Sequence, residues 1–333
     1  MKTQRLWVLV MLAGITVSCS KQNKTPQTIE EIITSARETT QRVLPVNVML
    51  ADPYQIQYLD GHLLWIDGTR DKLLTVYDLQ QQTVVRQVVN EGKGPFEILP
   101  PVQLLTDPAE HTVGLLSRRT GQYTVYPLAD LICDTLLRPV RSFQFAQGRD
   151  HCVKIGGNRY LSAFYFPDTV ASAAVCDTAG KFLRWINTYP SEIMEIENPS
   201  DRYMKGQSSM AYLPAEQVLC IAYTSYLDRI QFFDMSSAEP TLVREYGVPE
   251  LKEKYTPSSL CTYATDRFIY VLWMNNLDKE RYVLKFDCEG GVRDCIEVGS
   301  KAYRFCVTLD DTKIYTLEQD SAAMPVVAEY RLR

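Results

Sequence analysis

The chain has 333 residues, of which 46% are hydrophobic and 23% are charged, the composition of an ordinary globular protein. This length accommodates one large domain or two smaller ones. The formal net charge of −5 excludes the concentrated lysine and arginine of a nucleic-acid-binding protein, so no nucleic acid is expected as a partner.

The first 18 residues predict a signal peptide. Lys2 and Arg5 supply positive charge, and residues 6–17 form an apolar run that is too short to span a bilayer. Cys19 follows the small residues of the expected cleavage site. An ordinary signal peptide with a chance cysteine is the alternative interpretation.

Residues 19–42 are expected to form a polar tether and a short helix that reaches about residue 42. Thr28 and Glu31 have the spacing of a capping box at the start of that helix. Eight cysteines remain after Cys19, several of them inside apolar strand-like runs, and no disulfide pairing is predicted.

From Tyr54 onward the sequence repeats a pattern of four strands and tight turns. The third strand of each repeat ends at a landmark, most often Asp after an apolar or aromatic residue. These landmarks are Asp78, Pro127, Asp177, Asp234, Asp287 and Tyr330. Their spacing is close to the 40–50 residues of blade-type repeats. The repeats predict an all-β fold, a six-bladed β-propeller over residues 43–333, with two packed β-sandwiches as the alternative.

The two ends of the propeller are expected to meet in one blade. The last repeat, from Tyr303, has room for three strands, and the apolar residues 43–50 belong to no repeat. Because an open ring leaves unpaired backbone groups, residues 43–50 are predicted to supply the outer strand of the last blade.

Two local features carry a resemblance to known proteins. Cys19 after the apolar run resembles the lipobox of bacterial lipoproteins, although Thr16 stands where leucine is usual. Together with the six repeats and the loop containing Gly92, Gly94 and Pro95, it resembles the TolB-like six-bladed propeller lipoproteins of Bacteroidota. In that family a Gly-x-Gly-Pro-type loop joins the first two blades, which implies a structural role for these three residues.

The resemblance implies an exported protein that is anchored to the outer membrane through an acylated Cys19. Surface-displayed lipoproteins of this kind often carry an acidic run after the cysteine. Its absence here favours the periplasmic face. The resemblance says little about activity, because propellers host many unrelated functions.

Cationic side chains gather in the loops expected to surround one mouth of the central channel. The candidate ligand-binding residues are Arg70, Arg119, Arg149, Arg202, Arg229, Lys279 and Arg281, and Arg118 lies in the same set of loops. The planar fork of arginine suits carboxylate and phosphate, which indicates an anionic ligand such as an acidic glycan or a peptide carboxylate. Pairing of these cations with neighbouring acids is the alternative.

Catalytic signals are weak. His62 and His111 are expected on the opposite face, and His151 alone can approach the site face. The sequence has no metal-ligand spacing, nucleophile elbow or phosphate loop, so neither a metal nor another cofactor is expected.

The leading hypothesis is therefore a non-enzymatic, lipid-anchored binding or assembly module of the cell envelope, with a glycan or an envelope protein as partner. The long insertion at residues 191–210 is a further candidate for contact with a partner. The alternative is a periplasmic hydrolase or lyase that acts on a sugar or lactone through channel carboxylates.

Overall fold

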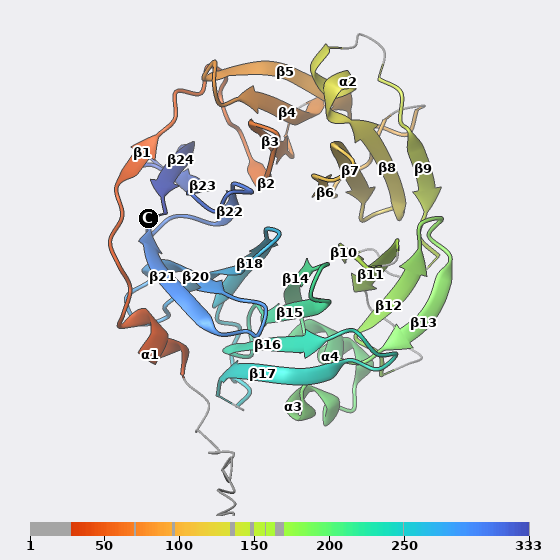
Figure 1. The fold of residues 1–333 in the computed structure, drawn as a ribbon, viewed down its shortest axis with the longest axis vertical. Coiled ribbons are helices and arrows are strands. Elements are labelled where there is room, and N and C mark those ends of the chain that lie inside the picture. The colour runs from red at the N-terminus through yellow and green to blue at the C-terminus, as the bar shows by residue number, and fades with distance from the viewer. Residues whose placement is uncertain are drawn as a thin grey trace, which may run out of the picture.

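The computed structural model describes residues 28–69, 71–94, 97–133, 137–146, 150–156, 158–163, 170–248 and 250–332. These residues form six four-stranded antiparallel sheets arranged in a ring around a central axis (Figure 1). The predicted six-bladed β-propeller is confirmed. The two-sandwich alternative is wrong, because each four-stranded sheet forms its own blade.

Within blades 1 to 5 the strands follow chain order from the channel outward, each antiparallel to its neighbour. Blade 1 contains β2 (Pro53–Leu59), β3 (His62–Asp67), β4 (Lys72–Asp78) and β5 (Thr83–Asn90). Blade 2 contains β6 (Val102–Asp107), β7 (Thr112–Ser117), β8 (Gln122–Pro127) and β9 (Arg141–Gln144). Blade 3 contains β10 (His151–Ile155), β11 (Arg159–Ala163), β12 (Ala173–Asp177) and β13 (Phe182–Ile186).

The remaining blades repeat this plan. Blade 4 contains β14 (Ser208–Leu213), β15 (Val218–Tyr223), β16 (Arg229–Asp234) and β17 (Thr241–Gly247). Blade 5 contains β18 (Ser259–Ala264), β19 (Ile269–Met274), β20 (Arg281–Phe286) and β21 (Val292–Val298). Blade 6 contains β22 (Arg304–Val307), β23 (Lys313–Gln319), β24 (Pro325–Arg331) and the N-terminal β1 (Gln41–Val43). The helices are α1 (Ile29–Ile33), α2 (Leu128–Cys133), α3 (Ser191–Met194) and α4 (Pro199–Lys205).

The turn and landmark residues take the places that the repeat predicts. Asp60 and Gly61 have positive φ angles of 46° and 77°, and they join β2 to β3 as the two central residues of a tight hairpin turn. Four landmarks are the last residues of third strands, namely Asp78, Pro127, Asp177 and Asp234. The repeat read from the sequence therefore has the correct phase.

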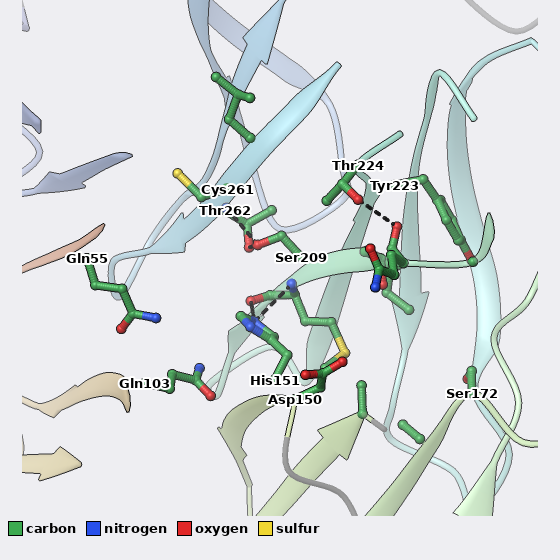
Figure 2. Close-up of a pocket in the computed structure, with 18 of the residues that line it drawn as sticks. Gln55, Gln103, Asp150, His151, Ser172, Ser209, Tyr223, Thr224, Cys261 and Thr262 are labelled. Atoms are coloured by element: carbon green, nitrogen blue, oxygen red, sulfur yellow. Dashed lines mark hydrogen bonds between the residues drawn. The ribbon is translucent and has the colours of Figure 1, made fainter. Parts of the chain in front are cut away.

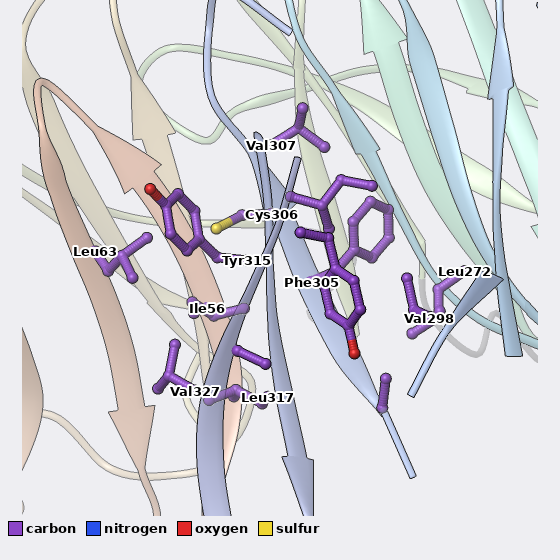
Figure 3. Packing of buried hydrophobic residues seen from close by; sticks show 14 of the residues in the cluster. Ile56, Leu63, Leu272, Val298, Phe305, Cys306, Val307, Tyr315, Leu317 and Val327 are labelled. Atoms are coloured by element: carbon purple, nitrogen blue, oxygen red, sulfur yellow. The ribbon is translucent and has the colours of Figure 1, made fainter. Parts of the chain in front are cut away.

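The core lies between neighbouring blades. Every residue of β15 and of β19 is buried, because both faces of these middle strands are covered by adjacent sheets. One cluster joins blades 5, 6 and 1, where Phe305 and Leu317 pack with Ile56 and with Leu272 (Figure 3). The ring is thus held together by apolar packing between blades.

The N-terminal segment closes the ring, as predicted, but with different residues. β1 pairs with β24 through Gln41–Val43, and the Leu44 amide donates to the Val327 carbonyl oxygen at 2.9 Å. The prediction that residues 43–50 form this strand is wrong beyond its first positions. Pro45 has no amide hydrogen to continue the ladder. Leu44 and Leu50 instead bury their side chains in the cluster of blades 5, 6 and 1.

The predicted capping box is confirmed at the start of α1. Thr28 Oγ1 accepts from the Glu31 amide at 3.2 Å, and Glu31 Oε2 accepts from the Thr28 amide at 3.1 Å. The helix ends at Ile33, well before residue 42. The backbone of Arg37 pairs with β21, which requires an extended chain there: its amide donates to Cys295 O at 3.0 Å. Tertiary pairing therefore overrides the helix.

The loop after β5 is built around the side chain of Glu97. Its carboxylate accepts from the Gly94 amide at 2.7 Å. A Cβ atom at Gly92 would overlap that carboxylate, and one at Gly94 would come within 2.9 Å of it, so the present position of the Glu97 side chain favours glycine, most strongly at Gly92. Pro95 lies outside the described residues.

The cysteines and helices add two findings. The eight cysteines after Cys19 are all free thiols, including Cys288 and Cys295. Within the described ranges, none of the helices combines the length and the apolar character needed to cross a bilayer.

Candidate functional site

Two cavities occupy the two ends of the central channel. The upper cavity, about 360 Å³, lies where the inner strands begin and is lined by Gln55, Arg118, Asp150 and Arg304 among others. The lower cavity, about 410 Å³, lies where the inner strands end. Both are lined by Gln103, His151, Met210 and Thr262, so they meet at this level of the channel.

A belt of hydrogen bonds surrounds the upper cavity at this level. One residue near the start of each inner strand hydrogen-bonds to the inner strand of the next blade. These belt residues are Gln55, Gln103, His151, Ser209, Cys261 and Arg304. Figure 2 shows the first five of them, on different strands around the cavity.

The individual bonds of the belt join one blade to the next. Gln103 makes two of them, donating to Cys152 O and accepting from Cys152 N, both at 2.8 Å. Ser209 Oγ accepts from the Thr262 amide at 3.0 Å, and Arg304 Nε donates to Tyr54 O at 2.9 Å across the closure of the ring. Much of the polar lining of the upper cavity therefore holds blades together.

His151 belongs to this belt as a neutral side chain. Its Nε2 accepts from the Met210 amide at 3.2 Å, and the Met210 carbonyl oxygen lies 3.1 Å from the same atom. Burial lowers the pKa of His151 to about 4, and the positive charge of Arg118 acts in the same direction. A neutral ring keeps Nε2 available to the Met210 amide at physiological pH.

Acidification is expected to destabilise the protein through His151. Its pKa is about 4 when folded and about 6.5 when unfolded, so the unfolded state binds the proton more readily. Stability should fall as the pH drops from about 6.5 towards 4, with a contribution of about 3 kcal/mol from this group.

The measurement is urea unfolding at pH 7 and pH 4.5 for the wild type and His151→Gln. Glutamine stands at the equivalent belt position in blades 1 and 2, so it is the matched replacement. The variant should lose about 2 to 3 kcal/mol less than the wild type between these pH values. Equal losses would show that His151 does not titrate as described.

The upper cavity has more positive than negative charge. Among its described lining residues, Arg118 and Arg304 are cations and Asp150 is the one carboxylate. Burial lowers the pKa of Arg118 and raises that of Asp150, and their mutual attraction opposes both shifts. The upper cavity therefore holds two guanidinium groups and one carboxyl group.

Arg118 has an unsatisfied donor among the residues that the structure describes. Its Nε is buried and has no hydrogen-bond partner in the described part of the chain. Arg304 donates from its side chain to backbone carbonyl oxygens, those of Tyr54, Leu260 and Tyr303. Neither guanidinium forms an ion pair at hydrogen-bond distance with a described acid.

The predicted ligand-binding cations lie mostly elsewhere. Arg229 is 3% exposed and forms a bidentate pair with Glu192, at 3.0 Å for both bonds. Arg202 donates to Ile196 O, and Arg281 donates to Ala302 O. Arg119 and Lys279 are exposed.

These five cations do not line the upper cavity. Arg229 follows the alternative interpretation, in which these cations pair with acids of the protein, because Glu192 holds its guanidinium. Arg70 and Arg149, like Cys19, lie outside the described residues.

His151 does line the upper cavity, the position predicted for it alone among the histidines. Sequence reasoning missed Arg304, and it placed Arg118 in the right loops without distinguishing it from Arg119. The belt positions carry glutamine, histidine, serine, cysteine and arginine, so no residue type recurs often enough to reveal them. The signal that could have revealed the belt residues is their common position near the start of the first strand in each blade repeat.

Carboxylates are few in the described lining of the upper cavity. Asp150 is the one described carboxylate of the upper cavity, so the paired acids of a glycoside hydrolase are not assembled there. Among the residues that the structure describes, no group of three or more histidine, cysteine or acidic side chains is placed to hold a metal ion.

The sequence matches no protein-family model and no curated protein. The fold is similar to that of solved structures. An exported protein from Bacteroides fragilis is 12% identical, with a TM-score of 0.59 over 92% of this chain and 98% of that one. A DUF4221 family member from Bacteroides vulgatus is 10% identical, with a TM-score of 0.59 over 89% and 97%. Kuenenia stuttgartiensis hydrazine synthase is 11% identical, with a TM-score of 0.50 over 83% and 82%. At these identities the similarity establishes a shared propeller fold.

Proposed function

We propose that this protein is an exported, lipid-anchored binding module that takes an anionic ligand in its upper cavity. The observation that carries the proposal is the pair of guanidinium groups, Arg118 and Arg304, that share this cavity with one acid. The site is preformed, because the inner strands and loops of a closed ring carry it. The side chains that contact a ligand are therefore held in place before the ligand binds.

The chemistry of Arg118 favours a carboxylate or a phosphate. A buried donor without a partner costs free energy, which a bound acceptor recovers. Arginine donates in a planar fork that matches two oxygens of such a group. The neutral hydroxyl and amide groups of the lining, such as Thr224 and Gln207, suit the hydroxyl groups of a sugar acid.

The cellular location rests on the N-terminal sequence. Residues 1–18 have the features of a signal peptide, and Cys19 stands where bacterial lipoproteins are acylated. The resemblance to TolB-like propeller lipoproteins and the fold similarity to an exported Bacteroides protein support the same location. We place the domain at the periplasmic face of the outer membrane.

The ligand class is tested by an array of acidic and neutral glycans, followed by calorimetric titration. Glucuronate and glucose form a matched pair that differs in one carboxylate. A peptide with a free C-terminus and its amidated form are the second pair, which distinguishes the two sources of the anion. Binding of glucose as tight as that of glucuronate, together with equal binding of the two peptides, would contradict the proposal.

Arg118→Gln is expected to weaken the binding of the preferred anion by about 10-fold to 100-fold, because one charge-assisted hydrogen bond contributes about 1.5 to 3 kcal/mol. The measurement is the dissociation constant by titration. Arg138→Gln, at an exposed arginine of blade 2 that does not line the cavity, is the control and should bind as the wild type does. An unchanged affinity of Arg118→Gln would place the anion elsewhere.

Cys19→Ser is expected to release the protein from membranes, because it removes the acylated thiol and the buried acyl chains that anchor the domain. The measurement is the share of the protein in membrane and soluble fractions after cell lysis. Full retention of the variant in the membrane fraction would rule out this anchor.

A further inference from the structure

The lower cavity has a different character from the upper one. Tyrosine rings and aliphatic side chains form most of its wall, among them Tyr160, Tyr212, Tyr263, Leu105 and Ala211. At about 410 Å³ it falls in the size range of small-molecule sites, roughly 300 to 1,000 Å³. Its mouth is bordered by turns between first and second strands, including Pro108, Pro214 and Asp266.

The cations of the lower cavity are already neutralised. Lys154 forms ion pairs with Asp107 and with Glu110, the second at 3.3 Å, and Arg141 pairs with the same Glu110. Burial alone would lower the pKa of Lys154, but the two acids raise it above its ordinary value. These groups form one closed cluster between blades 2 and 3, with no cation left over for a ligand.

Asp266 is the exception among the charges of this lining. It is exposed at the mouth, and within the described ranges its carboxylate accepts no hydrogen bond and forms no ion pair. Its neighbour Arg267 is held by Asp311, with Nε and Nη2 at 2.9 Å and 2.7 Å from one carboxylate oxygen. Among the charged residues that line the lower cavity, Asp266 alone has no ion-pair partner in the described part of the chain. Its negative charge lies beside apolar walls.

We propose that the lower cavity binds a small amphipathic amine, with its apolar body between the tyrosine and aliphatic walls and its ammonium group at Asp266. This site differs from the anion site of the proposed function: Arg118 and Arg304 line the upper cavity, whereas Asp266 lies at the mouth of the lower one, although the two cavities meet between them. Burial of the apolar body supplies most of the affinity. The carboxylate supplies the preference for a cation.

The probes that test this site are 1-naphthylmethylamine and 1-naphthalenemethanol, which share one apolar body and differ in charge. Titration at low salt should show binding of both, with the amine bound about threefold to fivefold tighter. That ratio corresponds to a partly exposed ion pair. Equal affinities, or no binding of either probe, would overturn the proposal.

Two variants locate the binding. Asp266→Asn should remove the preference for the amine while the alcohol still binds, and Ala264→Phe should abolish binding of both probes by filling the cavity. Glu216→Gln removes an exposed acid that does not line the cavity and should leave both affinities unchanged. A preference for the amine that persists in Asp266→Asn would overturn the proposal even if Ala264→Phe fails to fold.

Discussion

Deleting residues 28–43 is expected to lower the free energy of unfolding by about 4 to 8 kcal/mol, the largest effect among these predictions. Ile29 and Ile32 are each 1% exposed and fill the cluster between blades 4 and 5. Full burial of one aliphatic side chain contributes about 1.5 to 3 kcal/mol. The deletion also removes β1, which leaves the outer edge of β24 unpaired.

A second contact in this segment adds to the expected loss. Arg37 reaches Asp294 on β21 with both Nε and Nη2, the shortest bond being 2.6 Å. The segment therefore ties blade 5 to blade 6 before the first blade begins, along the outside of the ring (Figure 1). This arrangement makes the N-terminal residues part of the propeller.

The measurement is urea unfolding of a chain that begins at residue 44 against one that begins at residue 28. Ile32→Ala in the longer chain isolates the buried side chain and should cost about 2 to 4 kcal/mol. If both chains unfold at the same urea concentration with the same slope, the N-terminal segment does not stabilise the ring.

Glu192→Ala is expected to destabilise the protein by about 3 kcal/mol, because it leaves the buried guanidinium of Arg229 without its main partner. The two bonds of this pair measure 3.0 Å, and Arg229 is 3% exposed. Glu245 remains 3.6 Å from Arg229 and limits the loss. The attraction also holds the pKa of Glu192 below its usual range, although burial opposes this shift.

The matched control is Glu195→Ala, which removes an exposed acid at the end of the same helix and should change stability by less than about 0.5 kcal/mol. Anion binding by folded Glu192→Ala should match the wild type, because Arg229 does not line the upper cavity. A variant with native stability and weakened anion binding would instead assign Arg229 to the ligand site.

The sequence by itself determined the architecture of this protein. The landmarks and the tight turns recur in phase because each blade repeats the same hydrogen-bonding and packing pattern. The missing fourth strand of the last repeat predicted closure by the N-terminus, because an unpaired sheet edge is unfavourable. The Thr28–Glu31 capping box was also readable, since its interactions are local.

Only the tertiary structure decided which residues meet in the channel. Arg118 and Arg119 are neighbours in one loop, yet Arg118 alone lines the upper cavity, beside Asp150 and Arg304 from other blades. The closing strand shifted to Gln41–Val43 because β24 and the core between blades fix its register. Strand periodicity depends on contacts within a blade, whereas the channel, the belt and the charge of each cavity depend on contacts between blades, which are distant in sequence.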